Sequence, residues 1–249
     1  MSVALLRQID HAVLQPTHTA ADVRMACELC REVGTASVCV KPSHVTLAAD
    51  LLAGSRVVVS TVIGFPHGGT SSWAKIAEAT HACEQGAVEL DMVINLGWAL
   101  AGELDQVEAE IAAIVAAARD HKATVKVIFE TGLLPSDNLK RQLCQLSERA
   151  GAAFVKTSTG YGMIKHADGH LVATGATEED VRLLRANCTP RVGIKASGGI
   201  RNLADAQRMI AAGATRLGTS ATAQIAQEVA RQANDSVGNE FSISSQSEY

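Results

Sequence analysis

The sequence predicts an α/β protein, a single (β/α)8 TIM barrel with a flexible C-terminal tail. The chain has 249 residues, 47% of them hydrophobic, which suffices for one sizeable core of the size that α/β barrels commonly have. Eight apolar runs alternate with segments whose apolar residues recur at helical spacing. Such alternation predicts a parallel sheet, and eight strands are the number that closes a barrel.

The expected strands are the short apolar runs. They lie at residues 6–14, 37–40, 56–64, 87–94, 124–130, 153–159, 191–197 and 215–220. The expected helices lie between them, at residues 19–34, 71–86, 103–121, 135–151, 177–188 and 202–213. Three of these helices end in the recurring pair Gly-Ala, at Gly86, Gly151 and Gly213. Glycine closes a helix in a left-handed turn, after which the chain enters the next strand.

The alternative architecture is an open doubly wound sheet. That fold favours a GxGxxG motif after an early strand, and the sequence contains none. We therefore expect the closed barrel to occupy residues 1–233. Residues 234–249 are polar and serine-rich, which is typical of a flexible tail rather than another element.

Composition and charge exclude several classes of function. The net charge is only −4, the basic residues are scattered and aromatic residues make up 3%, so we expect no nucleic-acid partner. The apolar run at the N-terminus is too short for a signal peptide, and no stretch approaches 18 apolar residues, so we expect a cytoplasmic protein without a membrane partner. Cys27 and Cys30 form a CxxC, but they lie in an amphipathic helix, where residues three apart share a face. A structural role is the simpler interpretation.

Two lysines lie near the ends of neighbouring predicted strands, Lys156 in FVKTST and Lys195 in GIKASGG. Alternate residues of each strand point into a barrel, and its chemistry gathers at the strand C-terminal ends. With strands about 4.8 Å apart, the two ammonium groups lie about 6 Å apart and repel by about 2.8 kcal/mol at an effective dielectric near 20. The pKa of one lysine therefore falls, which makes its amine a nucleophile toward carbonyl groups.

Ion pairing with carboxylates inside the barrel is the structural alternative. Glu89 and Asp91 share a face of one strand, and Lys126 and Glu130 point inward from the next. Charges on four or more strands are rare in a purely structural barrel core, however. We interpret Glu89 and Lys126 as a deeper pair and Asp91 as available for proton transfer.

Glycine-rich loops follow the last strands, in ASGGIR and LGTSA, and STGYG follows the strand of Lys156. Free backbone NH groups at a helix start bind anions, and the last two loops of such barrels often hold phosphate. Arg201 adds a positive charge there. These loops predict a phosphate group on the ligand.

The motifs IDHAVL, VCVKP, GFPHG, ELDMVIN, KVIFETG, FVKTSTG, GIKASGGIR and GTS occur in this order between about residue 8 and residue 221. Together they resemble the deoxyribose-phosphate aldolases, and the KTSTG and KASGG pair is the most specific part. The resemblance implies a class I aldolase without metal or other cofactor. Such an enzyme reversibly cleaves 2-deoxy-D-ribose 5-phosphate to D-glyceraldehyde 3-phosphate and acetaldehyde. The same resemblance suggests a homodimer.

The resemblance also implies roles for individual residues, which the charge argument alone left open. Lys156 forms the Schiff base, Lys195 lowers its pKa, and Asp91 transfers protons with water. The implied substrate-binding residues are Asp10, Thr157 and Thr159. The implied phosphate-binding residues are Gly160, Gly198, Gly199, Gly218 and Ser220, together with Arg201. Some family members carry a lysine after STG, where this chain has Tyr161, which leaves the charge of the phosphate site open.

Other candidates have competing interpretations. His67 and His81 invite a zinc site, but no HxH or HExxH motif accompanies them, and we expect His81 on a helix surface. Cys39 either faces the barrel interior or fills the core, and we expect the latter. Tyr249 ends the chain, as a catalytically useful tyrosine does in some family members. The rival functions are a transaldolase-like enzyme acting on another sugar phosphate and a catalytically silent phosphosugar-binding barrel.

Overall fold

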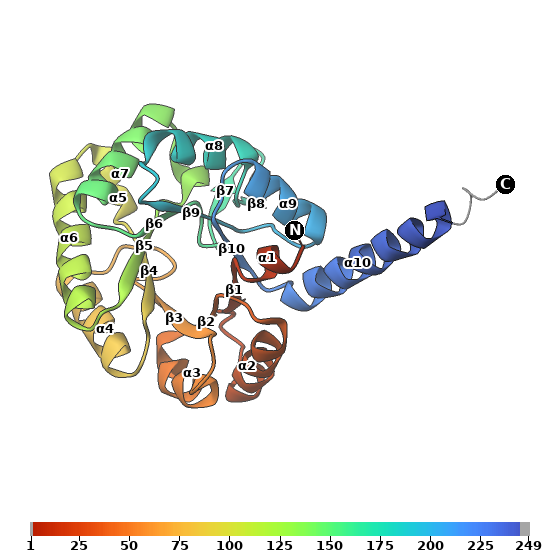
Figure 1. Ribbon diagram of the computed structural model, residues 1–249. Coiled ribbons are helices and arrows are strands. Elements are labelled where there is room, and N and C mark those ends of the chain that lie inside the picture. The colour runs from red at the N-terminus through yellow and green to blue at the C-terminus, as the bar shows by residue number, and fades with distance from the viewer. Residues whose placement is uncertain (1, 245–249) are drawn as a thin grey trace.

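The computed structural model describes residues 2–244 and contains a closed barrel of eight parallel strands (Figure 1). Neighbouring strands in the barrel follow the order β1-β10-β9-β6-β5-β4-β3-β2. The strands are β1 (Ile9–Val13), β2 (Ser37–Val40), β3 (Val58–Ile63), β4 (Glu89–Val93), β5 (Thr124–Ile128), β6 (Phe154–Lys156), β9 (Gly193–Ser197) and β10 (Arg216–Thr219). Because β1 pairs with both β2 and β10, the sheet has no edge, and the predicted closed barrel is confirmed over the open sheet.

Helices surround the barrel on its outer side (Figure 1). They are α1 (Ser2–Leu6), α2 (Ala20–Val33), α3 (Val45–Leu52), α4 (Ser72–Glu84), α5 (Leu96–Ala101), α6 (Leu104–Asp120), α7 (Asp137–Arg149), α8 (Glu178–Asn187), α9 (Leu203–Ala211) and α10 (Thr222–Ser244), with 3-10 turns η1 (Pro42–His44) and η2 (Thr131–Leu133). The glycines predicted to end helices adopt positive φ values, 108° at Gly86, 88° at Gly151 and 113° at Gly213. An L side chain rarely adopts such a backbone, which explains glycine at these turns.

An antiparallel hairpin interrupts the barrel pattern between β6 and α8. Its strands are β7 (Met163–Lys165) and β8 (Leu171–Ala173), and the sequence did not predict them. Each is only three residues long and all of its residues are exposed, so neither carries the buried apolar run by which the barrel strands were recognised.

Helix α10 follows the last barrel strand, β10, and extends away from the barrel (Figure 1). Its first turns pack against α9 and the short helix α1. The predicted domain boundary at residue 233 falls within α10 and stays a prediction. Among the helices of residues 2–244, none combines the length and the apolarity needed to cross a membrane.

Candidate active site

A cavity of about 380 Å³ opens where the barrel strands end. Lys156, Ser197 and Thr219 are the last residues of β6, β9 and β10, and all three line it. Most of the residues predicted for catalysis or binding also line this cavity: Asp10, Lys156, Thr159, Gly160, Lys195, Gly198, Gly199, Arg201, Gly218 and Ser220. Residues predicted separately from the sequence are therefore brought together by the structure around one cavity.

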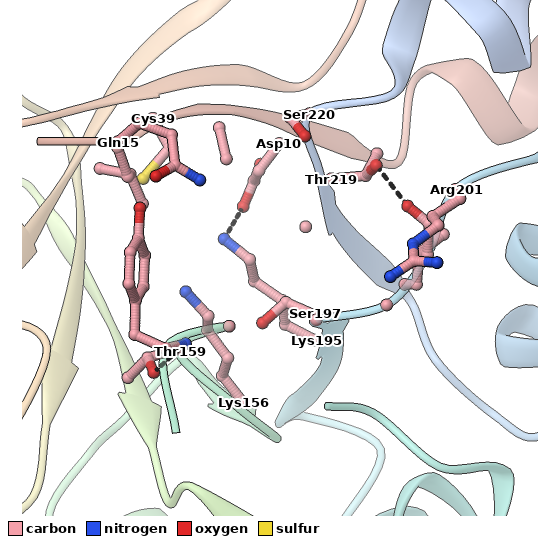
Figure 2. A pocket seen from close by; sticks show the side chains of 18 of the residues that line it. Asp10, Gln15, Cys39, Lys156, Thr159, Lys195, Ser197, Arg201, Thr219 and Ser220 are labelled. Carbon is pink, nitrogen blue, oxygen red and sulfur yellow. Dashed lines mark hydrogen bonds and ion pairs between the residues drawn. The ribbon is translucent and has the colours of Figure 1, made fainter. Parts of the chain in front are cut away.

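The two lysines reach into the cavity side by side, close to Asp10 (Figure 2). Lys156 and Lys195 are register partners on β6 and β9, so both side chains leave the sheet at the same height and on the same face. The Nζ atoms of both lysines donate to the same oxygen of Asp91, Oδ2, each at 2.6 Å. Asp91 itself is fully buried below the cavity and does not line it. One carboxylate thus holds the two amines together.

A second tier of charges lies below this pair. Lys126 Nζ lies 2.6 Å from Glu89 Oε2, which confirms the predicted deeper pair. It also contacts Asp91 at 2.8 Å and Asp10 at 3.1 Å. Arg216 Nη1 lies 2.6 Å from Asp10 Oδ1 and 2.8 Å from Glu89 Oε2. The barrel interior is therefore one continuous ionic network and not a set of separate pairs.

The surroundings of the two lysines move their pKa values in opposite directions. Burial lowers the pKa of Lys156, and the charge of Lys195 adds to this, while Asp91 opposes it without reversing the direction. Burial also acts to lower the pKa of Lys195, but Asp10 and Asp91 together outweigh it and leave the pKa raised. From the sequence we expected repulsion between the lysines to lower the pKa of one of them, and burial to lower that pKa further. In the structure burial is the larger cause, and the number of carboxylate neighbours selects the lysine.

The carboxylates keep their charge. Burial acts to raise the pKa of Asp91, but three ammonium groups outweigh it and hold that pKa well below its usual range. Asp10 behaves in the same way beside Lys126, Lys195 and Arg216. Both groups are therefore anions at neutral pH and accept protons before they donate any.

The loops after β9 and β10 bring backbone donors and small residues to one side of the cavity. Gly198 and Gly199 adopt positive φ values of 90° and 83°, which few residues other than glycine adopt. Arg201 and Ser220 also line the cavity (Figure 2), and Ser220 comes from the loop after β10. At the start of α9, the NH groups of Leu203 and Asp205 donate to Glu228 and Asn202. Helix α10 starts just beyond the loop after β10, and the first NH groups of a helix have no partner inside it. Such a site suits an anion.

Close packing also explains why position 218 is a glycine. A side chain at this position would place its Cβ 2.7 Å from Ser197 Cβ and 3.2 Å from Lys195 Cε. Glycine here leaves the room through which Lys195 reaches the cavity.

Several predicted residues lie elsewhere. Thr157 is fully buried and bonds the backbone of Ser197, donating to its carbonyl oxygen at 3.2 Å and accepting from its NH at 3.1 Å. It ties β6 to β9 and does not line the cavity, and its predicted contact with the substrate stays a prediction. Glu130 does not point inward from β5 as predicted, because it follows the strand with a positive φ of 54°. Tyr249 lies outside the described residues.

The structure also shows where the two histidines, Cys39 and Tyr161 lie. His67 and His81 are exposed, as predicted for His81. Among residues 2–244, no group of three or more His, Cys, Asp or Glu side chains is arranged to hold a metal ion. Cys39 is buried but lines the cavity, so its expected role in the core is wrong (Figure 2). Tyr161 lines the cavity, and its ring meets Phe65 edge to face at 5.4 Å between centroids.

Arg216 was not predicted as a site residue from the sequence. It precedes Gly218 by two residues, so the alternation used for the other strands would have placed it inside the barrel. Four further residues line the cavity that were not predicted to do so: Ser197, Thr219, and Gln15 and His18 from the loop after β1. No motif marks Gln15 or His18, so the sequence offered no signal for them.

Comparison with known proteins identifies the family of the chain. A family model described as DeoC/LacD family aldolase matches residues 4–227. A deoxyribose-phosphate aldolase of Caldanaerobacter subterraneus subsp. tengcongensis is 44% identical over 229 residues, which cover 92% of this chain and 94% of the relative. One from Bacillus cereus is 46% identical over 235 residues, covering 94% of this chain and 99% of the relative.

A solved structure gives the same result. The deoxyribose phosphate aldolase of Aeropyrum pernix, described as having a unique tetrameric structure, is 33% identical with a TM-score of 0.82, and the match covers 91% of each chain. The resemblance read from the motifs is confirmed over nearly the whole barrel. The chain belongs to the DeoC/LacD family of aldolases, which are carbon–carbon lyases.

Proposed function

We propose that the protein is a class I aldolase that reversibly cleaves 2-deoxy-D-ribose 5-phosphate to acetaldehyde and D-glyceraldehyde 3-phosphate, with Lys156 as the Schiff-base amine. The names of the relatives support the substrate. The observation that carries the proposal is the state of Lys156. It opens on the cavity with a lowered pKa, whereas the pKa values of Lys126 and Lys195 are raised.

The first step uses this neutral amine. Its nitrogen attacks C1 of the open-chain aldehyde to give a carbinolamine. A proton taken up from solvent lets the C1 oxygen leave as water, and a positively charged iminium ion forms. The C3 hydroxyl then loses its proton to a base, and the C2–C3 bond breaks. The electron pair of that bond moves into the iminium, which becomes an enamine, and C3 departs as the aldehyde of glyceraldehyde 3-phosphate. Without the iminium the same bond would leave a free carbanion.

Asp91 and a water molecule handle the protons in this proposal. The carboxylate is ionised and lies 2.6 Å from both amines, so it accepts a proton first and returns it later. Protonation of the enamine at C2 and hydrolysis of the imine then release acetaldehyde. Lys195 remains charged and keeps the neighbouring amine neutral. Asp10, which is ionised at the cavity wall, binds substrate hydroxyl groups.

The phosphate group lies in this proposal against the loops that carry Gly198, Gly199 and Ser220, with Gly160 and Gly218 beside them. Their backbone NH groups and the start of α10 supply donors, and Arg201 supplies charge. Thr159 contacts the sugar from the loop after β6. Binding energy from the phosphate, remote from the reacting bond, positions C1 beside the amine.

The proposal also covers the role of the C-terminal Tyr249, the oligomeric state of the protein and its location in the cell. Tyr249 assists protonation of the enamine, so its deletion slows proton exchange at C2 while imine formation stays unchanged. The protein forms a homodimer, which light scattering tests. It works in the cytoplasm, in keeping with its six unpaired cysteines.

Product analysis with a substrate panel tests the function. We expect cleavage of 2-deoxyribose 5-phosphate to release acetaldehyde and glyceraldehyde 3-phosphate in equal amounts, and ketose phosphates to be poor substrates. Faster cleavage of a ketose phosphate donor would establish the transaldolase-like alternative. Binding of the sugar phosphate without any cleavage or reductive trapping would leave the silent binding barrel.

A further inference from the structure

The ionic network inside the barrel holds more cationic groups than carboxylates. The described residues that make it up are Lys126, Lys156, Lys195 and Arg216 on one side and Asp10, Glu89 and Asp91 on the other. Four cations thus face three anions. A buried charge without a counter-charge is costly, so full protonation of this network is disfavoured.

The contacts indicate which group gives up its proton. Lys126 touches three carboxylates, Lys195 two and Arg216 two, but Lys156 touches Asp91 alone. Arginine does not lose its proton in proteins. Lys156 has the fewest carboxylate contacts of the four groups, so it is the group that loses its proton.

Arg216 and Glu89 form the lower end of this network and lie away from the reacting atoms. Neither lines the cavity. The guanidinium makes two contacts with the Glu89 carboxylate, at 2.8 and 3.2 Å, and lies 4.9 Å from the centre of the Phe154 ring. The side chains of both residues are only 14% exposed, so water screens their charges weakly.

We propose that Arg216 and Glu89 are positioning residues that set the protonation of Lys156 by fixing the charge balance of the barrel interior. This inference rests on the proposed role of Lys156. Arg216 supplies the surplus cation, because without it three cations would face three anions and Lys156 would keep its proton. Glu89 limits the surplus, because without it four cations would face two anions.

The two residues therefore act on Lys156 with opposite signs. Replacing Arg216 by methionine raises the pH at which Lys156 becomes neutral, and replacing Glu89 by glutamine lowers that pH. Replacing both restores the surplus of one and brings the midpoint back. Arg216 pairs in register with Lys195, which pairs with Lys156, so its backbone lies about two strand spacings, or about 10 Å, from that of Lys156. A unit charge acting over this distance shifts the midpoint by about one pH unit.

Other titratable groups also face Lys156. They are Asp91 on β4, Lys195 on β9, Lys126 on β5, Asp10 on β1, Cys39 on β2 and Tyr161 from the loop after β6. All of them are unchanged in the variants. Burial raises the pKa of the Cys39 thiol, and also that of the Tyr161 hydroxyl, so neither is an anion at neutral pH. The comparison therefore isolates the two substituted charges.

Reductive trapping with acetaldehyde and cyanoborohydride measures the midpoint directly. The Lys156 nitrogen adds to the aldehyde carbon, water leaves, and hydride from cyanoborohydride reduces the C=N bond to give an ethyl-lysine. Acetaldehyde carries no ionisable group, so the pH dependence of the trapping rate, compared at each pH with that of an exposed lysine, reports the protein. The rate on the Lys156 peptide is followed by mass spectrometry across pH.

The variants are Arg216→Met, Glu89→Gln and the double variant. The conservative Arg216→Lys keeps the charge and is expected to keep the wild-type midpoint. Arg149→Met and Glu108→Gln, which disrupt an ion pair on the outside of the barrel, are the matched controls and are expected to leave the midpoint unchanged.

We expect the midpoint to rise by about one pH unit in Arg216→Met, to fall in Glu89→Gln and to return within a few tenths of a unit in the double variant. The inference would be overturned if the pH midpoint for trapping on Lys156 did not change in either single variant, or if it moved in the same direction in both. If Arg216→Met does not fold, Glu89→Gln and the double variant decide the matter by the same signs. Wild-type protein that never traps on Lys156 would instead overturn the proposed function.

Discussion

Replacement of Lys195 by methionine tests how strongly the second lysine controls the first. Both Nζ atoms lie 2.6 Å from Asp91 Oδ2, so they are at most about 5.2 Å apart. At an effective dielectric near 20, two unit charges at this distance repel by about 3 kcal/mol. Lys195 also competes with Lys156 for Asp91, so its loss favours the charged form of Lys156 in two ways.

We expect the midpoint for trapping of acetaldehyde on Lys156 to rise by about two pH units in Lys195→Met. Because fewer amines are then neutral, the trapping rate at pH 7 falls by about a hundredfold. The assay is the pH dependence of the rate on the Lys156 peptide, with folding checked by circular dichroism. Lys140→Met is the control, since Lys140 pairs with Asp180 on the outer helices. A midpoint that stays within half a unit, or moves to lower pH in folded protein, would refute the electrostatic reasoning.

Three further predictions concern residues around the site. Gly218→Ala is expected to lower turnover at least tenfold with little loss of protein yield, since the added Cβ occupies the path of the second lysine; unchanged kinetics would contradict this. Glu130 is 2% exposed and accepts hydrogen bonds from the Thr159 NH and hydroxyl. Glu130→Met is therefore expected to raise the KM for the sugar phosphate more than it lowers kcat, and Glu130→Gln is expected to keep a KM close to that of the wild type. Equal losses in both variants would argue against a positioning role. Lys75→Met leaves the buried Glu110 without its cation and is expected to cost about 3–5 kcal/mol in urea unfolding, whereas a loss below about 1 kcal/mol would contradict a structural ion pair.

The sequence predicted the barrel well because the periodicity of each strand is a local signal. The eight apolar runs correspond to the eight barrel strands, and the helix-ending glycines adopt the expected conformation. The site followed from the same periodicity, since alternate residues at strand ends face one space. The inward positions of Lys156, Lys195 and Asp91 were predicted in this way, and the glycine loops from their composition.

The rest depended on contacts between distant residues. The sequence showed that Lys156 and Lys195 were neighbours, but the choice between them depends on how Asp10 and Asp91 are shared. Arg216 followed the same alternation, yet its partner Glu89 lies on β4, across the barrel. Such pairings arise from closure of the sheet and have no local signal.

Short and exposed elements were the other gap. The hairpin of β7 and β8 has only three residues a strand and no buried face, so the apolar pattern is missing. Glu130 was assigned to β5 because it continues an apolar run, but the strand ends at Ile128 and the backbone turns. Where a strand ends depends on its hydrogen-bonding neighbours, which the run itself does not reveal.

The identity of the reacting lysine is the central claim, and one measurement tests it most directly. The protein is incubated with 2-deoxyribose 5-phosphate, reduced with borohydride, digested and mapped by mass spectrometry. The account predicts one reduced adduct per chain, on Lys156. An adduct on Lys195 would mean that the roles of the two lysines are reversed, and the absence of any adduct in protein that binds the sugar phosphate would contradict Schiff-base catalysis.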